Sequence, residues 1–311
     1  MKRSFWLTVL VALGLGAAAQ KQNTKPASTS LPNTLLWKIS GNNLQKPSYL
    51  FGTMHMLCAN DIELSDSLKS AIRGADKVYL ELDMDDMFQM MAAMTHMNMR
   101  SDTTLSDLLS PADYKKVKDY FEEHSGMIPF SVLERFKPLL IESMVMEQSP
   151  KCENMIVMEQ LVMQEAKEND VEIKGLETMD YQLGIFDSIP YKAQAQQLVK
   201  MVNDEKKGDT GEEKEMEILT NAYRQQQLDK LDELTKKEDM GIKNFTDILL
   251  YNRNAAWAKK LQALMARNAL VVAVGAGHLP GEKGVINLLR KAGYTVEPVK
   301  NDMIKKKVKE I

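Results

Sequence analysis

Two of the four histidines stand in the same short frame, three residues after a glycine. Residues 52–55 (GTMH) follow the apolar run YLF, and residues 275–278 (GAGH) follow the apolar run LVVAV. Glycine after a strand permits a tight turn and a close approach of the backbone. Ligands of open α/β sheets bind outside the carboxyl ends of the strands. Each frame is therefore predicted to hold its imidazole, His55 or His278, at the ligand-binding edge of a sheet.

A carboxylate interrupts a third apolar run, because Glu81 lies within residues 77–82 (KVYLEL). A charged group inside such a strand needs a partner, a metal ion or a catalytic role, since burying it unpaired is costly. An outward-facing position at the strand end would also accommodate it. Beside two positioned histidines the functional interpretation is favoured, and the candidate catalytic residues are His55, Glu81 and His278.

Two imidazoles and one carboxylate are a common ligand set for a hydrolytic metal ion with an open position for water. Such an ion polarises a carbonyl and lowers the pKa of its water toward ~7. The same residues can act without metal if one histidine is a general base that Glu81 orients. The chain has no H-E-x-x-H helix and so is not an ordinary zincin. The residue types favour a divalent cofactor (Mn²⁺, Co²⁺ or Zn²⁺) held by these three side chains, and leave both mechanisms open.

Two further groups are candidates for binding substrate. Glu177 follows the short predicted strand 171–174 (VEIK), and Arg253 with Asn254 lies in an amphipathic segment at 249–258. An arginine beside an amide can hold a carbonyl or a carboxylate. Buried structural hydrogen bonds would explain all three residues equally well.

The elements that must position these side chains alternate along the chain. Strands are predicted at 35–39, 47–51, 77–82, 171–174, 269–274 and 294–299, where β-branched and aromatic residues are bounded by Gly, Asp or Pro. Helices are predicted at 62–73, 112–123, 138–148, 155–168, 211–234, 245–267 and 283–292. This order predicts an α/β fold with a mixed, mostly parallel central sheet formed from both ends of the chain, and a large helical insertion at about 84–268.

The first residues have the features of an export signal. Lys2 and Arg3 precede an apolar run at 5–16, and Ala17 to Ala19 supply the small residues of a cleavage site. An uncleaved anchor is the alternative. Residues 1–19 are predicted to be a signal peptide, 20–33 a flexible linker, 34–300 the catalytic domain and 301–311 a solvated basic tail. The protein is expected to be periplasmic or secreted, without a membrane span after cleavage.

The net charge of −3 argues against a nucleic-acid partner. In an exported protein the two cysteines, Cys58 and Cys152, are disulfide candidates, with two buried thiols as the alternative. Residues 84–99 contain seven methionines and His96. Thioethers could hold Cu(I), but a flexible apolar helix face explains them more simply. Neither His96 nor His124 stands in a glycine frame.

The motifs occur in a recognisable order: LWKI at 36–39, YLFGTMH at 49–55, YLELD at 79–83, GLET at 175–178, RNAAW at 253–257 and VGAGHLPG at 274–281. Over residues 34–298 they resemble the TraB/GumN family, which is related to the Tiki metalloproteases and more distantly to erythromycin esterases. The resemblance implies a hydrolase-like site built from His55, Glu81 and His278. In the Tiki branch such residues serve divalent-metal-dependent peptide cleavage, and in the esterase branch similar residues act without a required metal.

The resulting expectation is an exported metal-dependent hydrolase, peptidase-like, acting on a peptide or a small ester or amide. The alternatives are a metal-independent His/Glu hydrolase of the esterase type, a non-catalytic protein that sequesters a peptide, and a copper-handling protein.

Overall fold

The computed structural model describes residues 30–55, 57–59, 62–86, 91, 94–124, 128–146, 154–206, 211–237 and 246–304. Met1–Ser30 is a unit of its own, and Leu31–Ile311 is the unit that carries the fold. The predicted signal peptide, most of the predicted linker and residues 305–311 of the predicted tail lie outside the described residues.

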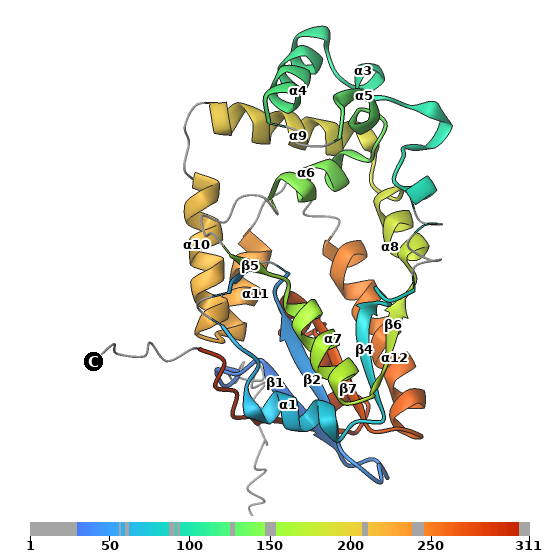
Figure 1. Ribbon diagram of the computed structural model, residues 1–311, viewed down its shortest axis with the longest axis vertical. Coiled ribbons are helices and arrows are strands. Elements are labelled where there is room, and N and C mark those ends of the chain that lie inside the picture. The colour runs from blue at the N-terminus through green and yellow to red at the C-terminus, as the bar shows by residue number, and fades with distance from the viewer. Residues whose placement is uncertain are drawn as a thin grey trace, which may run out of the picture. The chain divides into compact units, whose positions relative to one another are not determined.

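A six-stranded sheet forms the centre of the second unit, with the strand order β6-β4-β7-β2-β1-β8 (Figure 1). Its strands are β1 (Leu36–Ser40), β2 (Ser48–Thr53), β4 (Lys77–Leu82), β6 (Glu172–Glu177), β7 (Leu270–Gly275) and β8 (Thr295–Val299). The pairs β4–β6, β4–β7 and β2–β7 are parallel, whereas β1 is antiparallel to both β2 and β8. The predicted α/β fold with a mostly parallel sheet is confirmed, and each of the six predicted strands is present.

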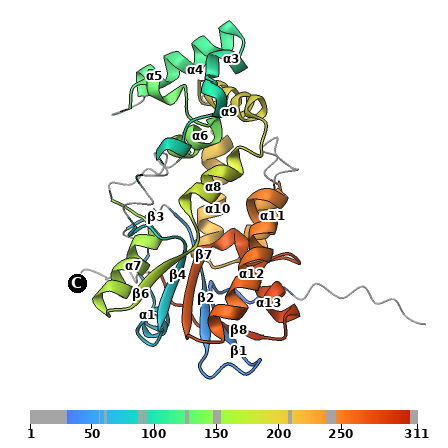
Figure 2. The ribbon, with the colours of Figure 1, turned by 90° about the vertical axis from the view of Figure 1, so that its right-hand side faces the viewer.

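Helices cover both faces of this sheet (Figure 2). One layer contains α1 (Asp66–Arg73) and α7 (Met158–Glu168), and the other contains α12 (Asn252–Met265) and α13 (Val285–Lys291). The first five residues of β7 are buried, which is why that strand reads as an unbroken apolar run rather than an alternating one. The sheet and both layers share one apolar core.

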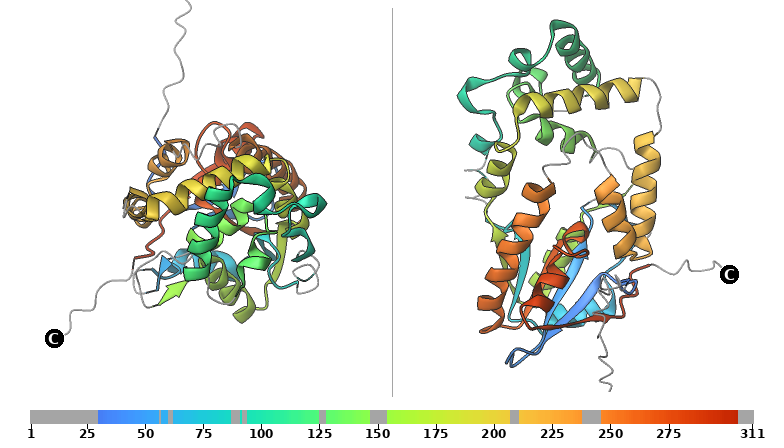
Figure 3. Two further views of the ribbon diagram at one scale, coloured as in Figure 1. Left: turned by 90° about the horizontal axis from the view of Figure 1, so that it is seen from above. Right: turned by 180° about the vertical axis from the view of Figure 1, so that it is seen from behind.

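A second group of helices has a separate core and follows the carboxyl ends of β4 and β6 along the chain (Figures 1 and 3). Its core is formed by α3 (Leu105–Leu108), α4 (Pro111–His124), α5 (Phe130–Leu133), α6 (Pro138–Met146) and α9 (Tyr191–Lys206). The helix α8 (Met179–Phe186) and the short turns η1 (Met94–His96) and η2 (Arg100–Asp102) lie in the same part of the sequence. Val117, Phe121, Leu198 and Val202 are buried in its core. The helices α8 and α9 were not predicted from the sequence.

The prediction of one continuous helix at 211–234 is wrong. The structure has two helices there, α10 (Gly211–Arg224) and α11 (Leu228–Lys237). Between them Gln226 adopts a positive φ of 56°. Its side-chain oxygen accepts hydrogen bonds from the Leu35 N–H at 3.0 Å and from Asn301 Nδ2 at 2.9 Å. These tertiary hydrogen bonds stabilise a conformation that the helical pattern alone does not predict.

The end of the described chain is ordered against the domain. Asn301 and Met303, which belong to the predicted tail, are 3% and 2% exposed. Asn301 accepts a hydrogen bond from the Ser65 hydroxyl at 2.6 Å. Among the helices that the structure describes, none is long and apolar enough to cross a membrane.

Candidate active site

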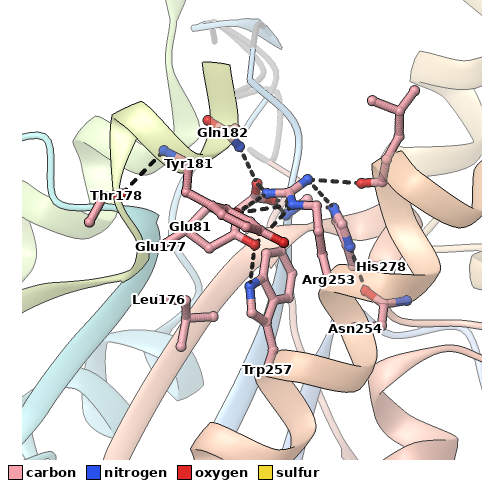
Figure 4. Close-up of polar contacts among 12 residues, drawn as sticks. Glu81, Leu176, Glu177, Thr178, Tyr181, Gln182, Arg253, Asn254, Trp257 and His278 are labelled. Carbon is pink, nitrogen blue, oxygen red and sulfur yellow. Dashed lines mark hydrogen bonds and ion pairs between the residues drawn. The ribbon is translucent and has the colours of Figure 1, made fainter. Parts of the chain in front are cut away.

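A buried arginine lies at the centre of the polar network at the carboxyl edge of the sheet (Figure 4). Arg253 Nη2 donates to Glu81 Oε2 and to Glu177 Oε2, in both cases at 2.7 Å. Its Nε also donates to both oxygens of Glu177, at 3.1 and 3.0 Å. One guanidinium thus binds two carboxylates, which is the fork geometry that arginine offers and lysine does not.

Neighbouring parallel strands deliver these carboxylates to one place. Glu177 pairs with Leu82 in the β4–β6 register, one residue after Glu81. The strands approach closely because Gly175 has no side chain: a Cβ there would lie 2.7 Å from the Asp83 nitrogen. Position along the adjacent strands β4 and β6 therefore explains why two carboxylates far apart in sequence meet here.

Helix α12 supplies the cationic side of the network from its first turn. Arg253 and Trp257 are four residues apart and so share one helix face. The Trp257 Nε1–H donates to Glu177 Oε1 at 2.9 Å, and the Arg253 guanidinium lies 4.7 Å from the centre of the indole ring. The π-helical turn η3 (Asp247–Tyr251) precedes α12, and its Leu249 carbonyl accepts from Arg253 Nη1 at 3.0 Å. The RNAAW motif therefore fixes the orientation of the guanidinium.

His278 enters this network from the turn η4 (Ala276–His278) and is 4% exposed. Its Nδ1 lies 2.6 Å from Asn254 Oδ1, and its Nε2 lies 3.3 Å from Arg253 Nη1. A guanidinium can only donate, so Nε2 is the acceptor and Nδ1 carries the hydrogen. Burial lowers the pKa of His278 to about 4, with the charges of Arg253 and His55 acting in the same direction. The imidazole is therefore neutral at pH 7.

Glu81 faces His278 as an ionised carboxylate. Burial raises the pKa of Glu81, but it is outweighed by the charge of His278, which is protonated at the low pH where Glu81 titrates, by the charge of Arg253 and by the hydrogen bond from the Gly275 N–H, which together lower the pKa to about 2. That hydrogen bond joins the Gly275 nitrogen to Glu81 Oε1 at 2.8 Å. Glu81 Oε1 also lies 3.7 Å from His278 Nε2. Gln182 of α8, which the sequence did not single out, donates to Glu81 Oε2 at 3.2 Å.

The two glycine frames lie next to each other, yet their histidines have different surroundings. Thr53 pairs with Gly275 in the β2–β7 register, and a Cβ on Gly52 would lie 3.1 Å from Ala276. The His55 side chain is 67% exposed, and its Nδ1 lies 3.0 Å from Glu159 Oε1. The structure thus gathers Glu81, Glu177, Arg253, Asn254 and His278 into one network, and places His55 beside it with Glu159.

Glu159 was missed in the sequence, although it is 7% exposed and lies in the first turn of α7. Burial opposes its ionisation, but the hydrogen bond and the charge of His55 outweigh this and keep the pKa of Glu159 below its ordinary value. No motif marks this residue. The contact arises because β3 (Leu57–Cys58) pairs with β5 (Met155–Ile156), which brings the start of α7 to the first glycine frame.

The donors fit a divalent ion in part. A carboxylate oxygen and an imidazole nitrogen 3.7 Å apart, as in Glu81 and His278, can both reach one ion at the ~2.0–2.2 Å expected for zinc. The hydrogen on Nδ1 of His278, bound by Asn254, leaves Nε2 unprotonated, as in metal-bound histidines, and an ion there would take the place of Arg253 Nη1 as the partner of that nitrogen. Within the described part of the chain, no three His, Cys, Asp or Glu side chains are grouped closely enough to hold an ion. His55, the third predicted ligand, is held by Glu159 instead.

Other candidate residues from the sequence lie elsewhere or are not described. Cys152 and much of the methionine-rich segment lie outside the described residues, so the disulfide and copper hypotheses stay predictions. Cys58 pairs with Met155 in the β3–β5 register, and Met155 is three residues after Cys152 in sequence. His96 lies 3.3 Å from an oxygen of Asp180, and His124 stacks on Tyr120.

Comparison with known proteins identifies several relatives of this chain. It is 23% identical to metalloprotease TIKI2 of Danio rerio, over 94% of this chain and 67% of that protein. It is 23% identical to metalloprotease TIKI1 of Homo sapiens, over 94% of this chain and 68% of that protein. The metalloprotease TIKI homolog of Nematostella vectensis is 23% identical over 96% of this chain and 76% of that protein.

These matches leave part of each relative uncovered: the chain spans 67% of the length of TIKI2 and 63% of the length of metalloprotease TIKI1 of Danio rerio. No solved structure matches the chain. The model of the TraB/PrgY/gumN family matches residues 35–298, which is most of the chain and includes both glycine frames. The chain belongs to the TraB/PrgY/gumN family.

Proposed function

We propose that this protein is an exported, metal-dependent hydrolase of peptide bonds whose site is the network around Glu81 and His278. The observation that carries the proposal is the 3.7 Å approach of an ionised carboxylate to a neutral imidazole at the carboxyl edge of the sheet. The relatives named metalloprotease support the same reaction class.

The charges of the network suit a cation. Glu81 and Glu177 share the single guanidinium of Arg253. The buried His278 stays neutral and directs an unprotonated Nε2 toward Glu81. A divalent ion held by Glu81 and His278 would supply polarisation of the scissile carbonyl and acidification of water. Arg253 and Glu177 then serve to orient Glu81, and Asn254 keeps the hydrogen of His278 on Nδ1.

A metal-independent hydrolase is the second candidate, and one contact favours it. Arg253 Nη1 lies 3.3 Å from His278 Nε2, so a fixed positive charge already lies beside the imidazole. Such a charge can stabilise an oxyanion in a buried site. The substrate would then be an ester or an amide, with Glu81 orienting the attacking group.

The test compares metal content and cleavage in one preparation. The protein is stripped with chelator, reloaded with Mn²⁺, Co²⁺ or Zn²⁺, and incubated with a mixed peptide library whose products are read by mass spectrometry. His278→Ala and Glu81→Gln are the site variants, and His124→Ala is the control outside the site. Cleavage that needs the ion and is lost in both site variants, but kept in the control, supports the proposal.

Three results would contradict it. Cleavage that survives exhaustive chelation yet is lost in Glu81→Gln would establish the metal-independent candidate. Full activity in both site variants would show that Glu81 and His278 do not form the active site. Stoichiometric peptide binding without any product would identify a sequestering protein.

Export has its own measurement. The apolar run at 5–16 and the alanines at 17–19 support cleavage before Gln20. N-terminal sequencing of the protein recovered from the periplasm or the medium is expected to begin at Gln20, whereas a retained Met1 in the membrane fraction would indicate an anchor.

A further inference from the structure

The two carboxylate oxygens of Glu81 have different partners. Oε2 accepts hydrogen bonds from Arg253 Nη2 at 2.7 Å and from the side-chain amide of Gln182 at 3.2 Å. Oε1 accepts from the Gly275 N–H at 2.8 Å and lies 3.7 Å from His278 Nε2. The hydrogen bonds therefore divide the carboxylate into one oxygen that two side chains hold and one oxygen that faces the imidazole.

We propose that Gln182 is a positioning residue of the active site: together with Arg253 it holds Oε2 of Glu81, so that Oε1 is the oxygen presented to His278. The functional part of this inference rests on the proposed function, because it takes Glu81 as an active-site residue; the hydrogen bond does not. A carboxylate can only accept hydrogen bonds, so the amide nitrogen of Gln182, and not its oxygen, faces Glu81.

The first turn of α8 places this amide at the edge of the sheet. Its N-cap, Thr178, directly follows the last residue of β6, and the Thr178 hydroxyl accepts from the Tyr181 N–H at 3.2 Å. The Thr178 carbonyl accepts from the Gln182 N–H at 3.1 Å. Figure 4 shows the Gln182 side chain directed from α8 toward Glu81. The end of a strand and a helix cap therefore determine where the amide lies.

The second group of helices holds α8 from the other side. Lys137, which directly precedes α6, is 1% exposed, and its Nζ lies 2.9 Å from both the Leu183 carbonyl oxygen and Asp187 Oδ1. The hydroxyl of Tyr191, in α9, donates to the same Asp187 oxygen at 2.5 Å. A buried ammonium group is costly unless it is paired, so these contacts fix α8 against α6 and α9. Through Gln182, the residue before Leu183, the second group of helices reaches the active site.

Loss of the amide donor has a defined consequence for Glu81. Oε2 would keep Arg253, but the same Nη2 also binds Glu177 Oε2 at 2.7 Å. The carboxylate would then be less firmly oriented toward His278. A group that orients a ligand or a catalytic side chain changes ion affinity or turnover. We therefore expect the affinity for a divalent ion and kcat to fall, with little change in KM.

The test uses the full-length protein and Gln182→Met, which keeps the length of the side chain and removes its donor. The chelator-treated variant is expected to bind Co²⁺ about 10-fold more weakly than wild type, with an altered visible spectrum. Its kcat on the cleaved peptide should also fall by about 10-fold, with little change in KM. The thermal midpoint of the variant shows whether it is folded. Gln196→Met, at an exposed position of α9, is the control and should change none of these properties.

The hydrogen bond is measured without any ion. In ¹H–¹⁵N spectra of the metal-free wild type, the side-chain amide of Gln182 is assigned by through-bond correlation to its own backbone. One of its two protons is expected to be shifted downfield by the carboxylate. The shift should disappear in Glu81→Ala, which removes the acceptor.

Two results would overturn the inference. A wild-type Gln182 amide without a downfield proton would exclude the hydrogen bond, and this reading is valid even if Gln182→Met fails to fold. Unchanged Co²⁺ affinity, Co²⁺ spectrum and kcat in a folded Gln182→Met would exclude the positioning role. If the wild type neither binds Co²⁺ nor cleaves a peptide, the proposed function fails, whereas the hydrogen bond between Gln182 and Glu81 is still decided by the spectra.

Discussion

Glu81 Oε2 and Arg253 Nη2 lie 2.7 Å apart although 172 positions separate them in sequence. This contact joins β4 of the sheet to α12 of the covering layer, and Glu177 of β6 binds the same guanidinium nitrogen. The site therefore depends on one buried arginine that holds two carboxylates in place. Several measurable consequences follow from this arrangement.

Removing the guanidinium leaves two buried carboxylates without their partner. Arg253→Met is expected to lower the free energy of unfolding by about 3–5 kcal/mol, the cost typical of breaking a buried ion pair from one side. Urea unfolding followed by circular dichroism measures the change. The control is Arg267→Met, at an exposed position just after the end of α12. Its free energy of unfolding should stay within ~0.5 kcal/mol of that of the wild type. A similarly small effect for Arg253→Met would show that the network contributes little to stability.

The close approach of β6 to β4 depends on a missing side chain. In Gly175→Ala the new Cβ would lie 2.7 Å from the Asp83 nitrogen and from the Glu177 carbonyl oxygen, both backbone atoms. We expect a loss of about 1–3 kcal/mol. The matched control is Gly184→Ala in α8, where a Cβ meets nothing within 4 Å. There the helix should gain roughly 0.5–1 kcal/mol. Equal thermal midpoints for Gly175→Ala and Gly184→Ala would contradict the close packing of β6 against β4 at Gly175.

Acidification should destabilise the metal-free protein in two steps. The folded pKa of His278 is about 4 against an ordinary value of 6.5, so the unfolded state binds the proton first and stability falls as pH drops from 6.5 to 4. The folded pKa of Glu81 is about 2 against 4.5, so a further loss follows between pH 4.5 and 2. Unfolding free energies measured across this range with chelator present test both steps. His278→Gln cannot take up that proton, so a pH dependence as steep as that of wild type between 6.5 and 4 would contradict the first step.

The disulfide prediction gains support from the β3–β5 ladder, because Cys58 pairs with Met155 only three residues after Cys152. Exported protein alkylated without reductant should show both cysteines protected. Closing a loop of this length contributes roughly 4–5 kcal/mol in the chain-entropy model, so Cys152→Ser should lower the thermal midpoint. Two alkylated cysteines in the untreated, folded protein would exclude the bridge.

The strands could be predicted from the sequence because each is a short run of β-branched and aromatic residues between Gly, Asp or Pro. The two glycine frames could also be predicted from the sequence, because each consists of four consecutive residues directly after a strand. Glu159 could not be found in this way, since its contact with His55 depends on the pairing of Leu57 with Ile156. The break at Gln226 depends on hydrogen bonds to Leu35 and Asn301, which are remote in sequence. Local patterns thus predicted the elements, and tertiary contacts decided the partners.

The most direct test of the central claim is a Co²⁺ titration of the chelator-treated protein, with visible absorption and peptide cleavage followed in the same sample. The account predicts saturable binding of one ion with cleavage rising in proportion. It also predicts that His278→Ala and Glu81→Gln lose both signals while His124→Ala keeps both. Normal Co²⁺ binding and cleavage in His278→Ala and Glu81→Gln would contradict the assignment of these two residues as the active site.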